Sequence, residues 1–214
     1  MKLYTYFRSS ASYRLRIALN LKGIAYDSIP VHLLRSGGEQ LLPAYRTINP
    51  AALVPSLDDG GVILTQSLAI MEYLDETQAG PSLLPSDALG RATVRALAML
   101  IAGDTHPLTN LRVLKYIKHE LGLSEEVKLE WYRHWMREGL ASVEALLARE
   151  GGDGLFCHGN AATIADCCLV PLAYNAERFE IDMAPYPHVV RIVAHCNSLP
   201  AFAAAHPSQQ PDAE

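Results

Sequence analysis

The change in hydrophobic pattern near residue 80 constrains the fold more than any other feature of this chain. Before it, short aromatic or β-branched runs typical of strands alternate with helical patterns. The stretch TQAGPSLLPSD, residues 77–87, then interrupts both periodicities with proline and glycine, as expected of a linker. Beyond it there is no good strand signal. The pattern predicts an α/β domain over residues 1–80 and an all-helical domain over residues 86–214.

The first domain has a definite predicted order of elements. Strands are expected in KLYTYF and AYDSIPVHLL, with a helix between them in SSASYRLRIALNLKG that Gly23 is placed to end. A loop with a short helix follows. The turn sequence Asp59-Gly60-Gly61 then predicts a β-hairpin, and Ser67 is placed to cap the next helix. The order β-α-β-α-β-β-α is that of a thioredoxin-like domain.

The second domain contains helical patterns at residues 88–121, 124–150, 163–179 and 187–205. Pro107 is expected to kink or break the first of them. Helical spacing places four residues of that pattern on one stripe: Leu97, Leu100, Ile101 and Asp104. A buried Asp104 would be costly without a partner, so it is expected either to pair with a buried group or to reach across a dimer interface. Thr163 and Asp166 match a capping box.

Composition excludes several classes of function. A formal net charge of -5 argues against nucleic acid or an anionic membrane as the main partner. No apolar run approaches the roughly 20 residues that span a bilayer, and the N-terminus is too short and polar for a signal peptide. The four cysteines lie in the last third without a C-x-x-C pair, which predicts buried thiols in a reducing cytoplasm. No metal site is expected.

Three serines, Ser9, Ser10 and Ser12, stand just ahead of the first helix. A helix N-terminus carries partial positive charge and unpaired amides, so it can hold an anion or stabilise a thiolate. Thioredoxin-like domains place a reactive cysteine at this strand-to-helix junction, but no cysteine occurs before Cys157. Either the site is inactive or the sulfur comes from a soluble thiol such as glutathione. On spacing alone, the simpler interpretation is that the serines only cap the helix.

A second candidate binding feature comes from NPAALVPSLDDGG and the TQS that follows it. A cis Val54–Pro55 bond would turn the Val54 backbone outward, where an extended peptide could pair with it. Gln66 and Ser67 offer an amide, a hydroxyl and backbone N–H groups that suit a carboxylate and an amine. The alternative is that Ser67 is only a helix cap.

Together these motifs resemble a known family. SSASYRLRIALNLKGI, NPAALVPSL, TQSLAIMEYL and TIADCCLVP are similar to the glutathione transferase superfamily, and the first of them, with NAERFEIDMAPYP, is similar to its zeta class. The resemblance runs from about residue 2 to residue 205. It implies the glutathione transferase fold, a homodimer, and glutathione-dependent cis–trans isomerisation of maleylacetoacetate or maleylpyruvate in the catabolism of tyrosine and other aromatic compounds. The implied chemistry is reversible addition of the thiolate to the double bond.

The resemblance also implies roles for particular residues. Ser9 would assist the thiolate, with Ser10 and Arg8 beside it. The rest of the glutathione site would comprise Gln40 at the glycine end, Val54 and Pro55 at the cysteinyl backbone, Gln66 and Ser67 at the γ-glutamyl group, and His106. Between the domains, the two carboxylates of a small dicarboxylate substrate would be bound by Arg8, His106, Asn110, Arg112 and Arg178. The sequence departs from the family's usual pattern at Ala11, Gly103 and Thr109.

Three other functions compete with this one. A zeta-type transferase could use the same thiolate to conjugate or dehalogenate small α-haloacids, and would then consume glutathione. A non-enzymatic binding or scaffold protein of the same fold predicts loss of the thiol-site motif, which is intact here. A stand-alone thioredoxin-like redox protein is excluded, since the junction has no cysteine. No single residue distinguishes maleylacetoacetate from maleylpyruvate.

Overall fold

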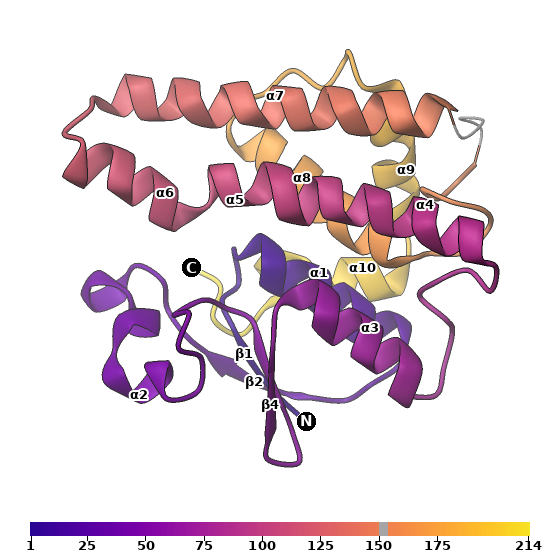
Figure 1. Cartoon of the computed structure of the whole chain (residues 1–214), viewed down its shortest axis with the longest axis horizontal. Helices are drawn as coiled ribbons and strands as arrows, with labels where there is room; N and C mark the ends of the chain where they lie inside the picture. Colours follow the sequence, from indigo (N-terminus) through magenta and orange to yellow (C-terminus); the bar gives the residue numbers. More distant parts are fainter. Residues whose placement is uncertain (150–153) are drawn as a thin grey trace. The chain divides into compact units, whose positions relative to one another are not determined.

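The computed structural model describes residues 1–149 and 154–214 (Figure 1). The chain divides into two compact units, which are Met1–Leu84 with Asn197–Glu214 and, separately, Pro85–Cys196. The division after Leu84 falls inside the expected linker. The second domain was expected to continue to residue 214, whereas residues 197–214 belong to the first unit.

The reason for this difference is a long-range contact within the first unit. Helix α10, Pro200–Ala205, packs against α1, Ser10–Leu21. The fully buried Arg16 donates from Nε to the Ala205 carbonyl at 3.1 Å, and Asn20 donates to the Ala201 carbonyl at 2.9 Å. These hydrogen bonds join groups that are far apart in sequence, so helical periodicity does not predict them.

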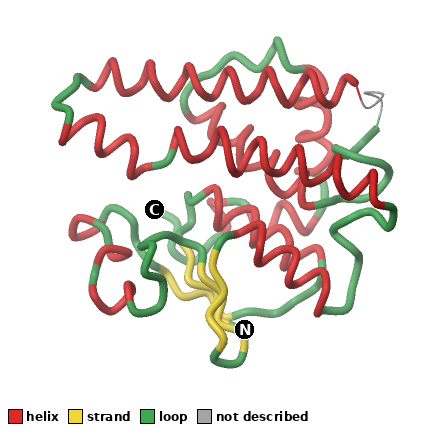
Figure 2. Tube along the Cα trace, in the orientation of Figure 1, coloured by secondary structure: helices red, strands yellow, loops and turns green. Residues whose placement is uncertain are grey.

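The first unit is a four-stranded sheet covered by helices, in the strand order β2-β1-β3-β4. Its strands are β1 Lys2–Thr5, β2 Asp27–Pro30, β3 Ser56–Asp59 and β4 Val62–Thr65. β1 pairs in parallel with β2 and antiparallel with β3. Helices α1 and α3, Ser67–Thr77, pack together on one side of the sheet, and the short α2, Pro43–Arg46, lies on the other side (Figures 1 and 2). The predicted order of elements is therefore confirmed. Two short 3-10 turns, η1 Arg35–Gly37 and η2 Glu39–Leu41, precede α2, and η5, Pro207–Gln209, follows α10.

Local chemistry explains the ends of these elements. Gly60 and Gly61 both have positive φ, 63° and 95°, which a two-residue hairpin between β3 and β4 requires. The Gly61 N–H donates to the Asp58 side chain at 2.7 Å, which fixes the turn. Gly23 ends α1 with φ 66° and donates to the Asn20 carbonyl.

The second unit is helical within the described residues. Its helices are α4 Ala88–Met99, α5 His106–Thr109, α6 Leu111–Lys115, α7 Glu125–Arg149, α8 Ile164–Arg178 and α9 Pro187–Asn197, with π-helical turns η3 Leu100–Thr105 and η4 Tyr116–Glu120. Helix α7 packs along η3 and α5. Helix α7 approaches η3 closely at Gly139, where an added Cβ would lie 2.2 Å from the Thr105 hydroxyl oxygen. Across the described residues, no helix is sufficiently long and apolar to span a membrane.

Two details of this unit differ from the sequence prediction. The predicted stripe holds for Leu97 and Ile101, but Asp104 is exposed because η3 is π-helical and rotates later residues away from the α-helical spacing. The chain continues in helix through Pro107 and breaks at Asn110, whose ψ is 145°. The final predicted helix is likewise divided into α9 and α10. The capping box of Thr163 and Asp166 is confirmed.

Candidate active site

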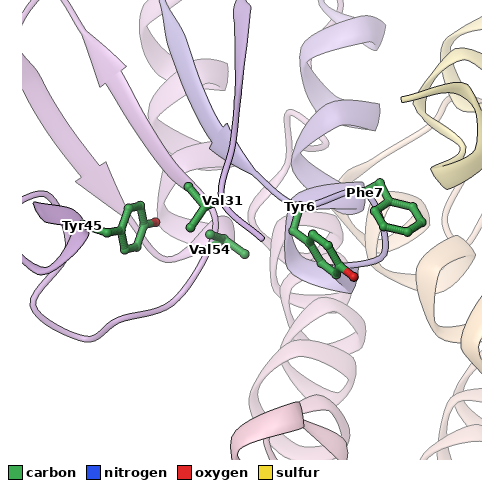
Figure 3. Close-up of a cluster of buried hydrophobic side chains, with 5 residues drawn as sticks. All are labelled: Tyr6, Phe7, Val31, Tyr45 and Val54. Atoms are coloured by element: carbon green, nitrogen blue, oxygen red, sulfur yellow. The ribbon is translucent and has the colours of Figure 1, made fainter. Parts of the chain in front are cut away.

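A cluster of buried side chains in the first unit brings the candidate segments together. The cluster consists of Tyr6, Phe7, Val31, Tyr45 and Val54. Figure 3 shows Val31 and Val54 between Tyr45 on one side and Tyr6 with Phe7 on the other. Tyr6 and Phe7 precede the serine motif in sequence, and Val54 precedes Pro55. Packing therefore fixes the end of β1, the end of β2 and the start of β3 relative to one another.

Ser9 is the N-cap of α1. Its side-chain oxygen accepts from the Ser12 N–H at 3.2 Å, so the capping interpretation of this serine is correct. A hydroxyl has one donor hydrogen and two acceptor lone pairs, so a capping serine can still donate its hydrogen to an anion. Ser10 is the first residue of α1 and is half-buried, as Ser9 is. Ser12 is fully buried, and its hydroxyl has no hydrogen-bond partner among the described residues.

The charges around this helix end favour an anion. The first turn of α1 carries no acidic side chain, so nothing on the helix itself neutralises its positive end. Arg16 is 0% exposed and donates to the carbonyls of Tyr6 and Phe7, at 3.4 and 2.9 Å. Arg8, half-buried, donates to the Tyr6 hydroxyl at 3.2 Å and lies over the Phe7 ring. Guanidinium groups therefore surround the turn that leads into Ser9.

Val54 is held in place by side chains on both sides of it. The Tyr45 hydroxyl donates to the Leu53 carbonyl at 2.7 Å and contacts the Ser56 hydroxyl at 3.0 Å. Asn49 donates to the same carbonyl at 2.8 Å. Burial raises the pKa of Tyr45, so its hydroxyl stays protonated at neutral pH. The Val54–Pro55 bond is cis, as the sequence interpretation supposed, and both residues are buried.

Gln66 and Ser67 stand at the start of α3. The N-cap of α3 is Gln66 and not Ser67, so the cap predicted at Ser67 is wrong. Gln66 is exposed, has φ 68° and ψ 109°, and makes no capping hydrogen bond with its side chain. The first turn of α3 also lacks acidic residues. Ser67 is 6% exposed, and its hydroxyl accepts a hydrogen bond from Arg14 at 3.3 Å. Arg14, 2% exposed on α1, thus links the N-terminal ends of the two helices.

Gln40 lies in a loop organised by His32. The His32 N–H donates to the Glu39 carboxylate at 2.7 Å, and the Glu39 N–H donates to the His32 carbonyl at 2.8 Å. The His32 ring packs edge-on against Tyr6 with centroids 4.9 Å apart, which joins this loop to the end of β1. The side-chain amide oxygen of Gln40 is buried without a hydrogen-bond partner among the described residues. A Cβ added to Gly38 would lie 2.7 Å from this amide.

These features fit a bound tripeptide with a carboxylate at each end and a thiol in the middle. The buried side-chain amide oxygen of Gln40, which has no partner among the described residues, marks this amide as a group that a ligand can contact. Uncapped N–H groups at α3 suit one carboxylate, and the end of α1 with Ser9 suits a thiolate. Glutathione has this arrangement of groups.

The chain's own cysteines are unsuited to this chemistry. All four are buried, and none forms a disulfide within the described residues. Burial raises the pKa of the Cys157, Cys167 and Cys196 thiols, and the nearby Asp166 carboxylate raises them further. A thiolate is therefore disfavoured at each of these positions.

We expect the native protein to resist thiol reagents because of this burial. Ellman's reagent at neutral pH should label essentially no cysteine in the folded protein and all four in denaturant. The denatured sample is the control for thiols lost to oxidation. Rapid labelling of the folded protein would contradict the burial of the thiols.

The second unit separates residues that were expected to share one helix face. His106 begins the short α5, whereas Asn110 is the N-cap of α6 and accepts from the Arg112 N–H at 3.0 Å. His106 and Asn110 therefore do not form a four-residue helical pair, because Asn110 interrupts the helix to cap the next one. Arg112 is exposed. The Trp131 indole donates to the Leu108 carbonyl at 2.8 Å and ties α5 to α7.

Arg178 occupies the last turn of α8 and is exposed. Its guanidinium donates to the Asn175 side chain at 2.9 Å and lies near the rings of Tyr174 and Phe179. These contacts orient the side chain while leaving donors of the guanidinium fork for a carboxylate. Among the residues predicted in this unit, Arg178 is thus the candidate whose side chain is best oriented to bind a carboxylate.

Sequence reasoning missed the residues that support the site. Arg14 could have been suspected, since Arg14 and Arg16 interrupt an apolar helix at positions that face the core. His32, Tyr45 and Asp212 carry no clear local signal, because each contacts a residue of another segment: His32 contacts Tyr6 and Glu214, Tyr45 contacts Leu53, and Asp212 contacts Phe7.

Comparisons with known proteins agree with this site. Residues 3–82 match the family model described as the glutathione S-transferase N-terminal domain. A probable maleylacetoacetate isomerase of Vibrio cholerae is 50% identical over 99% of this chain and 97% of its own length. A holo structure of maleylpyruvate isomerase, described as a bacterial glutathione S-transferase in the zeta class, superposes with a TM-score of 0.96 at 45% identity and full coverage of both chains. A maleylacetoacetate isomerase from Methylobacterium extorquens, with bound malonate and glutathione, gives the same values.

The chain therefore belongs to the zeta class of the glutathione transferases, in the family of the maleylacetoacetate and maleylpyruvate isomerases.

Proposed function

We propose that this protein is a glutathione-dependent cis–trans isomerase of maleylacetoacetate or the closely related maleylpyruvate. The observation that carries the proposal is the N-terminus of α1, where Ser9 and buried guanidinium groups favour an anion. No cysteine of the chain stands at this junction in the sequence, so the thiol has to come from a bound molecule. Relatives that are 45–50% identical over almost the whole chain carry these two names.

The first unit binds the cofactor in this proposal. Bound glutathione supplies a thiolate nucleophile for reversible addition to the conjugated double bond. Ser9 donates its hydroxyl hydrogen to that sulfur, with Ser10 at the same helix end, and so favours the ionised form at neutral pH, where a free thiol is mostly protonated. Val54 and Pro55 hold the cysteinyl backbone.

The ends of the tripeptide are held by two further pairs of contacts. Gln66 and Ser67, with the uncapped start of α3, bind the γ-glutamyl group. Gln40 binds the glycine carboxylate by donating a hydrogen bond from its side-chain amide nitrogen. Turning the amide by about 180° places this nitrogen where the buried, unpartnered oxygen lies in the structure.

Arginine side chains recognise the substrate in this proposal. Maleylacetoacetate and maleylpyruvate each carry two carboxylates, and guanidinium is the side chain that matches a carboxylate bidentately. Arg8 in the first unit and Arg178 in the second are the preferred ligands, and His106, Asn110 and Arg112 are the remaining candidates. Donors fixed before the reaction also stabilise negative charge that develops on the oxo-acid arm. The malonate-bound relative supports a site for a small dicarboxylate.

A spectrophotometric assay of both substrates, with and without catalytic glutathione, tests the proposal. We expect turnover of at least one substrate only in the presence of glutathione, with no net consumption of the thiol. Consumption of glutathione with small α-haloacids and no isomerisation would favour the dehalogenase alternative instead.

We expect the change Arg178→Ala to raise KM for the dicarboxylate by about tenfold, since it removes a charged hydrogen-bond donor. The affinity for glutathione should stay unchanged. Arg91→Ala, which removes a guanidinium on α4 that is outside the candidate set, is the matched control. Equal KM values in the two variants would remove Arg178 from the substrate site.

We also propose that the protein is a cytoplasmic homodimer. Buried cysteines without a disulfide suit a reducing compartment, and the homodimer is implied by the resemblance to the zeta class. Light scattering of the purified protein measures the oligomeric state directly.

A further inference from the structure

The segment that follows α10, Pro207–Glu214, folds back along the first unit and contacts two of the candidate glutathione-binding segments. The Asp212 carboxylate accepts a hydrogen bond from the Phe7 N–H at 3.0 Å. The Glu214 carboxylate lies 2.7 Å from Arg35 and 3.4 Å from Nε2 of His32. One short segment is thus connected both to the turn before Ser9 and to the loop that carries Gln40.

The Asp212 contact supports the turn that leads into α1. Within this turn the Ser9 N–H donates to the Tyr6 carbonyl at 3.0 Å, and Arg16 donates to the Phe7 carbonyl. Both of those bonds arise from α1 or the turn itself, whereas Asp212 holds the Phe7 amide from a distant part of the sequence. The second carboxylate oxygen of Asp212 is buried without a hydrogen-bond partner among the described residues. A buried carboxylate oxygen without a hydrogen-bond partner costs folding free energy, so a gain in stability does not by itself explain the position of Asp212.

The Glu214 contact supports the loop that carries Gln40. The Nδ1 atom of His32 accepts from the N–H groups of Leu34 and Arg35, at 3.2 and 2.8 Å. A neutral His32 therefore carries its hydrogen on Nε2, the atom that faces Glu214. Interaction with His32, and then with Arg35, lowers the pKa of the Glu214 carboxyl, so it is charged at neutral pH.

We propose that Asp212 and Glu214 are positioning residues for glutathione: Asp212 fixes the turn before Ser9, and Glu214 fixes the loop that carries Gln40. The inference rests on the proposed function, because the two positioned segments are its thiol and glycine contacts. Neither carboxylate touches the reacting atoms in this account. Each acts by limiting the movement of a segment that would otherwise have to be ordered when the tripeptide binds.

Calorimetric titration with glutathione, alongside steady-state kinetics, tests the proposal. We expect Asp212→Ala to raise the Kd for glutathione about tenfold, equivalent to about 1.4 kcal/mol. Asp212→Asn keeps an acceptor oxygen for the Phe7 N–H and should recover part of that loss. Glu214→Gln should raise the Kd by about threefold. At saturating glutathione, kcat and the KM for the dicarboxylate should stay within about twofold of the parent values.

Asp27→Asn is the control, because it removes an exposed carboxylate from β2 in the same unit. If the Asp212 and Glu214 variants lose thermal stability but bind glutathione as the parent does, the segment is only structural and the inference fails. Glu214 is exposed, so its variant keeps the test valid even if Asp212→Ala does not fold. A parent protein that binds glutathione but does not isomerise contradicts the proposed reaction alone. One that does not bind glutathione contradicts both.

Discussion

Ser9→Ala should lower kcat/KM for isomerisation by about a hundredfold or more, because it removes the hydroxyl that, in the proposed function, donates a hydrogen bond to the glutathione thiolate. The same change also deletes the N-cap of α1, which costs about 1 kcal/mol of folding stability. The protein should therefore remain folded with a slightly lower Tm. Isomerase kinetics and thermal unfolding on the same preparation separate the two effects.

Ser124→Ala provides the matched control for the lost cap. Ser124 accepts from the Val127 N–H at 3.2 Å at the start of α7, so its removal deletes a cap of the same kind outside the candidate site. This variant should show a comparable Tm shift with unchanged activity. Ser9→Thr retains the hydroxyl and should keep much of the activity. Full activity in Ser9→Ala would transfer the role to Ser10 or to Arg8.

The α/β unit was predictable because its signals are local. The glycines of the β3–β4 turn, Gly23 after α1 and Ser9 before it each act within a few residues of their own position. Such signals fix the order of strands and helices, and they locate Ser9 at a helix end. They do not reveal how far apart in space two such ends lie.

The helical unit was less predictable because periodicity assumes a uniform helix. The π-helical η3 changes the residue spacing, which exposes Asp104, and Asn110 starts a new helix by capping it. Pro107 was expected to kink or break the helix, but it occupies the first turn of α5, where proline is tolerated. In each case a local effect outweighed the uniform helical periodicity: the spacing of the π-helix, the cap formed by Asn110, or the tolerance of a first helical turn for proline. The composition does not show which effect decides the structure at a given residue.

Support for the candidate site was unpredictable for a different reason. The Phe7 amide and Asp212 are separated by 205 residues, and the Tyr45 hydroxyl on α2 reaches the carbonyl of Leu53, the residue before Val54. Sequence motifs identify groups that could contact a ligand, whereas the residues that orient those groups emerge only from tertiary packing.

Asp166→Ala should destabilise the protein more than any other single change considered, by about 4 kcal/mol. Asp166 is 0% exposed and accepts hydrogen bonds from the Thr163 N–H and hydroxyl, both at 2.8 Å, and from the Cys157 N–H at 2.7 Å. Burial raises the pKa of this carboxyl, and these donors oppose the shift. An alanine leaves the donors buried without a partner, at about 1–3 kcal/mol for each group that finds no substitute.

Urea unfolding followed by tryptophan fluorescence reports on the second unit, which contains Asp166. The chain's two tryptophans, Trp131 and Trp135, both lie on α7 of that unit. Asp166→Asn keeps one acceptor oxygen and should lose about half as much as the alanine variant. Asp182→Ala removes a carboxylate that accepts from the Ala184 N–H at an exposed position, so it should cost under about 1 kcal/mol. If Asp166→Ala unfolded at the same urea concentration as Asp182→Ala, the buried network would contribute little, and packing of α8 alone would have to stabilise this unit.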